Sequence, residues 1–136
     1  MTNEYLENLV RVGKLHRVRP SEEEISNLIR KGLAKLNDLA EAELSAFTRF
    51  DVAYNAAHAL SLAAVWRAGY RSDSCYLVFQ CTQHTLDLDA NSRRVLDLAH
   101  RNRNRAEYEG DVDVEESMIE ALTRVSELIA KRVQEI

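Results

Sequence analysis

The segment of this sequence best suited to chemistry is HRNRNRAEYEG, at residues 100–110. Cationic and amide side chains alternate along it, in the order Arg101, Asn102, Arg103, Asn104 and Arg105. Arginine carries a planar guanidinium that binds a phosphate through two parallel hydrogen bonds, so the segment indicates contact with a phosphate or a base. The alternative interpretation is structural: a buried hydrogen-bond network or a contact with another subunit.

Helical geometry separates these side chains into an inward and an outward group. With about 100° of rotation per residue, one side of the expected helix is formed by Val95, Leu98, Ala99, Asn102 and Ala106. Arg103 falls on the shoulder of that side. Because a polar group next to a core face is costly unless it is hydrogen-bonded, Asn102 and Arg103 are the two residues that need a partner.

The outward group consists of Arg101, Asn104 and Arg105. Asp97 stands four residues before Arg101, a spacing that predicts a surface ion pair on a helix. Cations near the end of a helix also interact favourably with its dipole. Arg101 and Arg105 therefore have an ordinary explanation as part of a solvated helix face.

Other motifs in the chain point away from metal or cofactor chemistry. The sequence contains no P-loop, nucleophile-elbow or H-E-x-x-H motif. The histidines form no recognisable metal-ligand signature; His84 and Asp87 share a helix face, but such a pair arises often by chance. Tyr54 and His58, four residues apart, are expected to be a packed pair. We therefore expect neither a metal nor a cofactor.

Composition limits the class of protein. The chain has 136 residues and a formal net charge of −4, so any contact with nucleic acid must come from a local patch of positive charge. No segment reaches the about 18 consecutive apolar residues needed to span a bilayer, and the beginning of the sequence does not resemble a signal peptide. We expect a cytoplasmic protein without membrane contact. Cys75 and Cys81 are interpreted as small buried groups rather than a disulfide.

The elements that must position these residues are helices. Only four glycines and one proline interrupt the chain, which favours long helices. Apolar periodicity and capping motifs predict helices at about 5–12, 21–44, 47–69, 73–86, 91–109 and 113–136. The capping motifs are Ser21 with Glu24 and Asp113 with Glu116, Gly69 and Gly110 end the third and fifth helices, and residues 87–91 are expected to form a turn. Small residues predict that the third helix is central, with an inner face formed by Phe50, Ala53, Tyr54, Ala57, Ser61 and Ala64. The apolar face of the last helix is formed by Met118, Leu122, Val125, Ile129, Val133 and Ile136. We predict an all-α, antiparallel up-and-down helical bundle with four core helices, a short N-terminal helix and a connecting helix. Residues 1–20 form an N-terminal helix and basic arm, and 21–136 form the bundle.

The chain resembles the HEPN family (higher eukaryotes and prokaryotes nucleotide-binding), across residues 21–136. The resemblance rests on RFDVAYNAAHALSLAAVWRAGYR, on the helix ending RNRNRAEYEG, on the acidic turn DVDVEES, and on a long C-terminal helix. It implies a small all-α bundle that forms a homodimer and is linked to RNA or nucleotides. Many members of this family are metal-independent ribonucleases, often toxins paired with a small nucleotidyltransferase antitoxin.

The ribonuclease motif of that family is an arginine, usually followed by a polar residue, and then a histidine, with four to six residues between the arginine and the histidine. Starting from either Arg101 or Arg103, the histidine position is Tyr108, and no histidine follows in the chain. An unperturbed tyrosine, with a pKa of about 10, is a poor base near neutral pH. By this register His100 lies on the wrong side of the motif.

We therefore expect a non-catalytic HEPN-like module that binds a nucleotide, RNA or a nucleotidyltransferase partner. The candidate binding residues are Arg101, Asn102, Arg103, Asn104 and Tyr108. One alternative is a metal-independent ribonuclease that uses Arg103, with Tyr108 or a histidine of another helix such as His58 as the base. The other alternative is a purely structural dimeric interaction protein.

Overall fold

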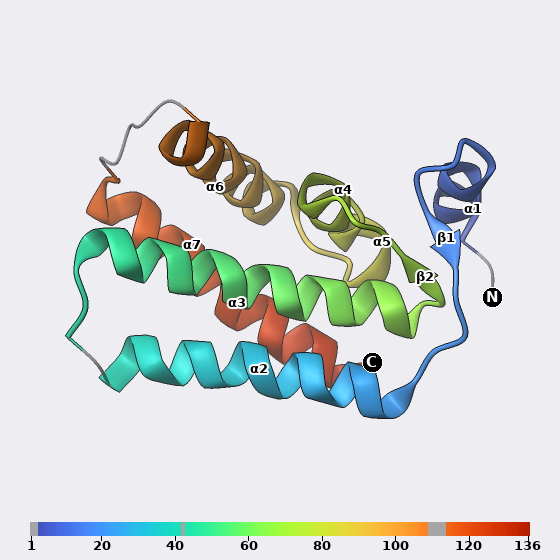
Figure 1. Ribbon diagram of the computed structural model, residues 1–136, viewed down its shortest axis with the longest axis horizontal. Helices are drawn as coiled ribbons and strands as arrows, with labels where there is room; N and C mark the ends of the chain where they lie inside the picture. The colour runs from blue at the N-terminus through green and yellow to red at the C-terminus, as the bar shows by residue number, and fades with distance from the viewer. Residues whose placement is uncertain (1–2, 42, 109–113) are drawn as a thin grey trace.

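The computed structural model describes residues 3–41, 43–108 and 114–136. Its helices are α1 (Glu4–Arg11), α2 (Glu22–Glu41), α3 (Ala46–Arg67), α4 (Cys75–Gln80), α5 (Thr82–Thr85), α6 (Ala90–Tyr108) and α7 (Glu116–Glu135). The four long helices, α2, α3, α6 and α7, run in alternating directions along the chain (Figure 1). This arrangement confirms the predicted all-α, antiparallel up-and-down bundle.

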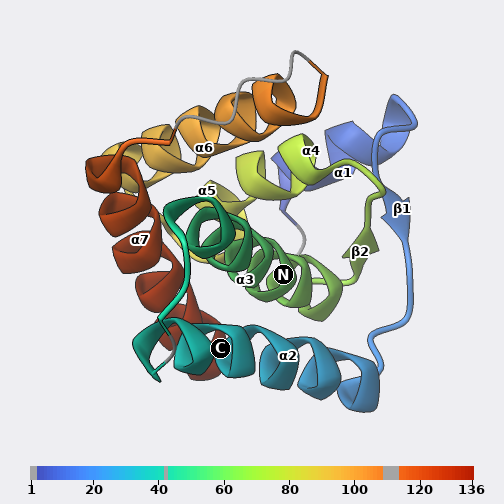
Figure 2. The same cartoon turned by 60° about the vertical axis from the view of Figure 1, so that its left-hand side comes forward.

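Helix α3 occupies the centre of the bundle, with α2, α6 and α7 around it (Figure 2). All the residues predicted to line its inner face are buried: Phe50, Ala53, Tyr54, Ala57, Ser61 and Ala64. Most of these side chains are small, so neighbouring helices approach α3 closely. Gly32 of α2 shows how close this approach is, because a Cβ atom at that position would lie 2.5 Å from Cγ of Leu60. Gly69 has a φ of 99° and follows the end of α3, as predicted.

Helix α2 begins with half of the predicted capping box. The backbone N–H of Glu24 donates to Oγ of Ser21 at 3.3 Å. The carboxylate of Glu24 accepts a hydrogen bond from the guanidinium of Arg71 at 3.3 Å. Glu24 therefore links α2 to the segment that follows α3.

The single helix predicted over 73–86 is wrong, because the structure divides this segment into α4 and α5. The two helices meet at Cys81. The hydroxyl of Thr82 is fully buried and donates to the carbonyl oxygen of Phe79 at 2.6 Å, in competition with the helical hydrogen-bond ladder. After α5 the predicted turn is present, with Asp87 at a φ of 52°. Cys75 and Cys81 are free thiols.

Helix α6 starts close to the predicted position but faces the core differently. Asp89 precedes it and accepts from the backbone N–H of Ser92 at 3.1 Å. Leu98 was expected in the core and is 43% exposed, whereas Leu96 and Ala99 are fully buried. The buried face of α6 is therefore rotated by part of a turn from the predicted face. The apolar spacing along the sequence is compatible with either Leu96 or Leu98 in the core, so it could not decide between them.

Helix α7 covers the bundle with the predicted residues Leu122, Val125, Ile129 and Val133, all of them buried. Ile136 was placed on the same face and is instead 52% exposed. The helix starts at Glu116, with Glu115 at the N-cap. The predicted end of α6 at Gly110 and the predicted cap at Asp113 lie outside the described residues.

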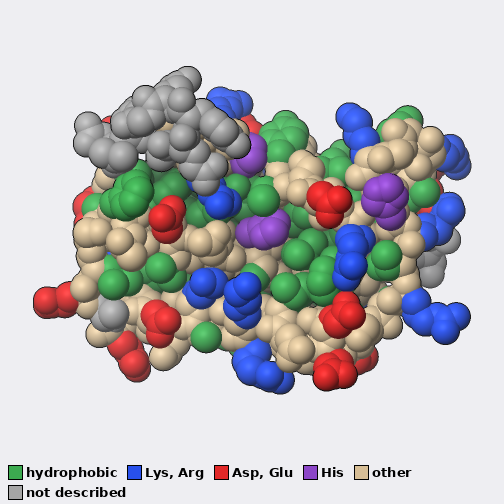
Figure 3. Space-filling model, in the orientation of Figure 1, with side chains coloured by type: hydrophobic (Ala, Val, Ile, Leu, Met, Phe, Trp, Pro, Cys, Tyr) green, Lys and Arg blue, Asp and Glu red, His purple; other side chains and the backbone are tan. Residues whose placement is uncertain are grey.

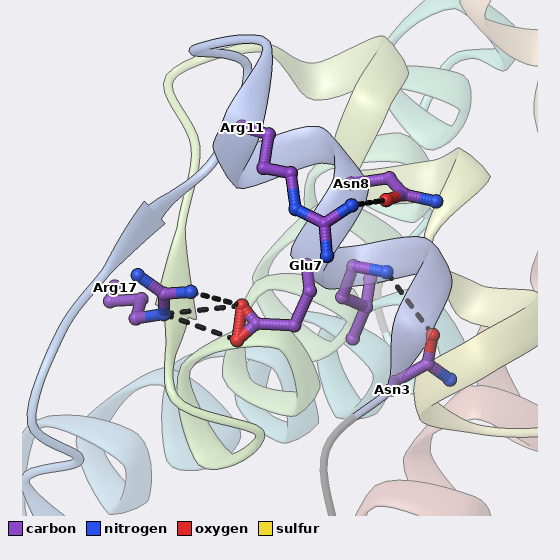
Figure 4. A network of polar contacts seen from close by, with 6 residues as sticks. Asn3, Glu7, Asn8, Arg11 and Arg17 are labelled. Atoms are coloured by element: carbon purple, nitrogen blue, oxygen red, sulfur yellow. Dashed lines mark hydrogen bonds and ion pairs between the residues drawn. The ribbon is translucent and has the colours of Figure 1, made fainter.

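The N-terminal segment packs on the bundle through an apolar cluster of its own. Its strand β1 (His16–Arg17) pairs antiparallel with β2 (Tyr70–Arg71), a pairing that sequence analysis did not predict. The buried members of the second cluster are Leu6, Leu15, Val65, Tyr70, Val78 and Cys81. Figure 4 shows the polar contacts that hold this segment, including the guanidinium of Arg17 on both carboxylate oxygens of Glu7. Asn3 caps α1 by accepting from the N–H of Leu6 at 3.1 Å.

Candidate functional site

The outward residues of the predicted site lie on the solvent side of α6. Arg101 is exposed, and its Nη2 lies 2.7 Å from Oδ2 of Asp97, as the spacing predicted. Asn104 and Arg105 are also exposed. The amide nitrogen of Asn104 lies 3.3 Å from Nε2 of His100. Asn104, a member of the outward group, therefore contacts a residue that belongs to the inner part of the site.

Arg103 and Asn102 are half-buried, as predicted for the inward group. The guanidinium carbon of Arg103 lies 4.5 Å from the centre of the Tyr54 ring on α3. This is a cation–π contact, in which the ring face partly compensates a desolvated positive charge. Arg103 thus extends from α6 over the central helix instead of into solvent. The side chain of Tyr108 lies outside the described residues.

His100 is part of the same site, although sequence analysis set it aside. Its Nδ1 lies 3.0 Å from the hydroxyl of Tyr54, and its ring lies beside that of Tyr76, with the centroids 5.5 Å apart. The position of His100 three residues before Arg103 puts both on one side of α6, so both reach Tyr54. A signal for this contact was available, because a buried tyrosine normally needs a hydrogen-bond partner.

His58 brings a second imidazole to the site from α3. It is half-buried and packs edge-on against Phe79, with a centroid separation of 6.1 Å. Tyr54 also packs edge-on against Phe79, at 5.4 Å. Each of the two residues expected to be a packed pair therefore rests against Phe79.

Charged side chains from two neighbouring helices act on the imidazole of His58. Burial lowers the pKa of His58 first, and the positive charges of Arg103 on α6 and Lys31 on α2 lower it further. Lysine, arginine and histidine side chains gather near the middle of the face shown in Figure 3, over α3 and between α2 and α6. We call the two cations Lys31 and Arg103, together with the imidazoles of His58 and His100 beside them, the cationic cluster.

Burial is the main cause of the pKa shifts of the other titratable groups of the site. Burial raises the pKa of Tyr54 to about 12, against the opposing effect of Arg103. Burial also lowers the pKa of His100, with Asp97 opposing this shift and Arg103 adding to it. At neutral pH the site therefore contains a protonated phenol, neutral imidazoles and permanent positive charge.

Such a site can hold a phosphate by charge and by hydrogen-bond donation, and its phenol is a donor rather than a base. Among the described residues, no group of three or more His, Cys, Asp or Glu side chains is arranged to hold a metal ion. A hollow of about 430 Å³ lies elsewhere, between α2 and α7, and is lined by Leu36, Leu39 and Ile119 among others. None of its lining residues belongs to the cationic cluster, so the chemistry and this hollow are separate features.

Comparison with known proteins adds no assignment: no family model, no curated protein and no solved structure matches the chain. Within the described ranges, none of the helices is both long enough and apolar enough to cross a membrane.

Proposed function

We propose that this protein is a non-catalytic HEPN-like module that binds the phosphates of a nucleotide or RNA at the cationic cluster. One observation carries the proposal: the guanidinium carbon of Arg103 lies 4.5 Å from the ring centre of Tyr54 on α3, so this charge from α6 stands over the central helix. The positive charges of Arg103 and of Lys31 on α2 both act on the imidazole of His58. The proposal includes a cytoplasmic location. It also includes a homodimer and the capacity to pair with a small nucleotidyltransferase, both of which rest on the resemblance to the HEPN family.

The charge distribution supports a phosphate ligand. The whole chain has a net charge of −4, so its overall field repels polyanions and only a local patch can bind them. Arg103 supplies a guanidinium, Lys31 supplies an ammonium, and a neutral imidazole at His58 can gain a proton when a phosphate approaches. We expect binding that weakens as the salt concentration rises, because each phosphate contact releases counterions.

The contacts of His100 support the absence of catalysis. Both of its ring nitrogens lie within hydrogen-bond distance of protein groups, namely the Tyr54 hydroxyl and the Asn104 amide. An imidazole held on both sides is a structural group rather than a proton acceptor for a substrate. Tyr54 itself, with a pKa of about 12, does not ionise near neutral pH.

The test is binding of a fluorescently labelled single-stranded RNA oligonucleotide to the full chain at several salt concentrations. We expect Arg103→Ala to weaken binding at least fivefold and to reduce the slope of log affinity against log salt by about one. Asn102→Ala should also weaken binding. Arg105→Ala removes the same charge from an exposed position of α6 and is the matched control, with an expected change below twofold.

Two results would contradict the proposal. If the wild-type chain binds neither RNA nor nucleotides at micromolar concentration and low salt, the module does not bind phosphates. If Asn102→Ala and Arg103→Ala lose the dimer or unfold, the purely structural interpretation is correct. Circular dichroism and light scattering on each variant separate these outcomes.

His58 supports a second candidate function, a metal-independent ribonuclease. Burial lowers the pKa of its imidazole, and the positive charge of Arg103 lowers this pKa further. A neutral imidazole can act as a general base, and an arginine beside it can hold the phosphate. RNA incubated with the protein in EDTA tests this candidate. Cleavage that is lost in both Arg103→Ala and His58→Ala supports it, and intact RNA at micromolar protein excludes it.

A further inference from the structure

The cationic cluster has an exposed aromatic ring at its edge. Tyr76 stands on α4 and is 46% exposed, although it is a large and partly apolar side chain. One side of its ring is tilted against His100, with the centroids 5.5 Å apart. His100 in turn contacts Tyr54, over which Arg103 lies. The exposed ring is therefore connected to the phosphate-binding charges through a short series of packed rings.

The inner side of the Tyr76 ring offers no room for a ligand. The hollow beside it has a volume of only about 30 Å³ and is lined by Tyr76, Phe79, Gln80, Arg93, Asp97 and His100. That volume holds about one water molecule. A flat ligand can therefore contact Tyr76 only on its outer, solvent-facing side.

A carboxylate that lines the same hollow as this ring is already paired with a positive charge. Asp97 lines the small hollow and opposes the lowering of the His100 pKa by burial, but its carboxylate is paired with Arg101 at 2.7 Å. Arg93, which lines the same hollow, donates to the carbonyl oxygen of Leu88 at 3.1 Å. A polyanion that approaches from the cationic cluster thus meets a neutralised ion pair beside Tyr76.

We infer that Tyr76 is a stacking platform for an unpaired base, and that the ligand of the cationic cluster is single-stranded RNA rather than duplex or base-free polyphosphate. This inference rests on the proposed function. Positive charge that follows the backbone, together with an aromatic face for a base, is the combination by which proteins bind single strands. Bases in a duplex are stacked on one another and cannot cover the ring.

The experiment compares three probes on the full chain: a single-stranded oligoribonucleotide, a duplex of the same sequence, and inorganic polyphosphate of similar length. Tyr76→Leu keeps an apolar side chain of similar size but removes the aromatic face. We expect it to weaken single-strand binding by about 5- to 100-fold and to leave polyphosphate binding unchanged. Tyr76→Trp should retain or strengthen single-strand binding, because a larger ring still stacks.

The chain supplies a matched control in Tyr5. This tyrosine is 40% exposed and stacks on His84 with the centroids 4.1 Å apart, but it lies on α1, away from α6 (Figure 1). Tyr5→Leu should change none of the three affinities. An equal loss in Tyr5→Leu and Tyr76→Leu would mean that the effect is general and would overturn the inference.

The outcomes separate this inference from the proposed function. If Arg103→Ala weakens single-strand binding and Tyr76→Leu does not, the module binds phosphates but Tyr76 is not a stacking platform. If the wild type prefers duplex or polyphosphate over the single strand, the inference is again wrong. If none of the three probes binds, the proposed function itself fails.

Discussion

Replacement of Gly32 by alanine tests the close packing of α2 on α3. The new methyl carbon would lie 2.5 Å from Cγ and 2.8 Å from Cδ2 of Leu60. Ordinary carbon–carbon contacts are about 3.5–4.0 Å, so the overlap is about 1 Å. Leu60 is fully buried in the main core, and the clash involves the branch point of its side chain as well as its methyl groups, so a rotation of the side-chain tip alone does not relieve it. The two helices must therefore move apart.

The magnitude follows from two opposing effects. Overpacking a well-filled core costs about 1–3 kcal/mol. Alanine in the middle of a helix is favoured over glycine by about 1 kcal/mol. Because the clash is severe and its neighbours are fixed, we expect Gly32→Ala to lower the free energy of unfolding by about 1–2 kcal/mol. An exposed helical glycine would show the opposite sign.

Urea unfolding followed by circular dichroism measures this change, and a double-mutant cycle identifies its cause. In the Leu60→Ala background the new methyl group has space, so Gly32→Ala should stabilise the protein by about 1 kcal/mol. The coupling between the two sites is then about 2 kcal/mol or more. If Gly32→Ala stabilises the wild type, or if the two substitutions are additive, α2 and α3 are not packed as described.

Three further predictions concern the protonation of histidines and two individual side-chain hydrogen-bonding groups. Burial lowers the pKa of His58, His84 and His100. At pH values near and below about 6.5 the unfolded chain therefore binds more protons than the folded chain. The free energy of unfolding, measured with urea, should fall as the pH is lowered from 7.5 to 5.5, and it should fall less in His58→Gln. Equal stability at both pH values would refute this prediction. Arg132 donates from Nη1 to the carbonyl oxygens of Leu86 at 2.9 Å and Asp87 at 3.1 Å, so Arg132→Gln should cost about 1–2 kcal/mol in thermal or urea unfolding, whereas the exposed neighbour Lys131→Gln should cost little. Tyr54→Phe removes the hydroxyl partner of His100 and should cost about 1 kcal/mol without loss of helical signal; a stabilised variant would show that this hydrogen bond contributes nothing.

The helices could be predicted from sequence because their signals are local. Ser21 and Gly69 mark ends through side-chain capping and positive φ, and the small residues of α3 predict a central helix. The boundary at Cys81 was missed because it depends on the buried hydroxyl of Thr82, which has no periodic signature. The pairing of β1 with β2 was missed for a similar reason, since two-residue strands distant in sequence carry no pattern.

The site could be predicted only in part. Spacing along one helix was sufficient to predict that Arg103 faces inward and that Asp97 pairs with Arg101. The same reasoning could not find Lys31, which reaches the site because α2 packs beside α3. His100 was set aside because a motif register was followed instead of the needs of a buried tyrosine. Tertiary contacts, rather than local spacing, decide the composition of the site.

The second apolar cluster implies that the N-terminal segment folds after the helices on which it packs. Leu6 and Leu15 pack against Val65, Tyr70 and Val78, which follow them much later in the sequence. The N-terminal segment is therefore made first but must wait for α3, β2 and α4 before its leucines can be covered. Long-range closure of this kind comes late in folding and opens early in the native state. We expect the amide protons of residues 4–17 to exchange faster with solvent than those of α3, as a separate cooperative unit.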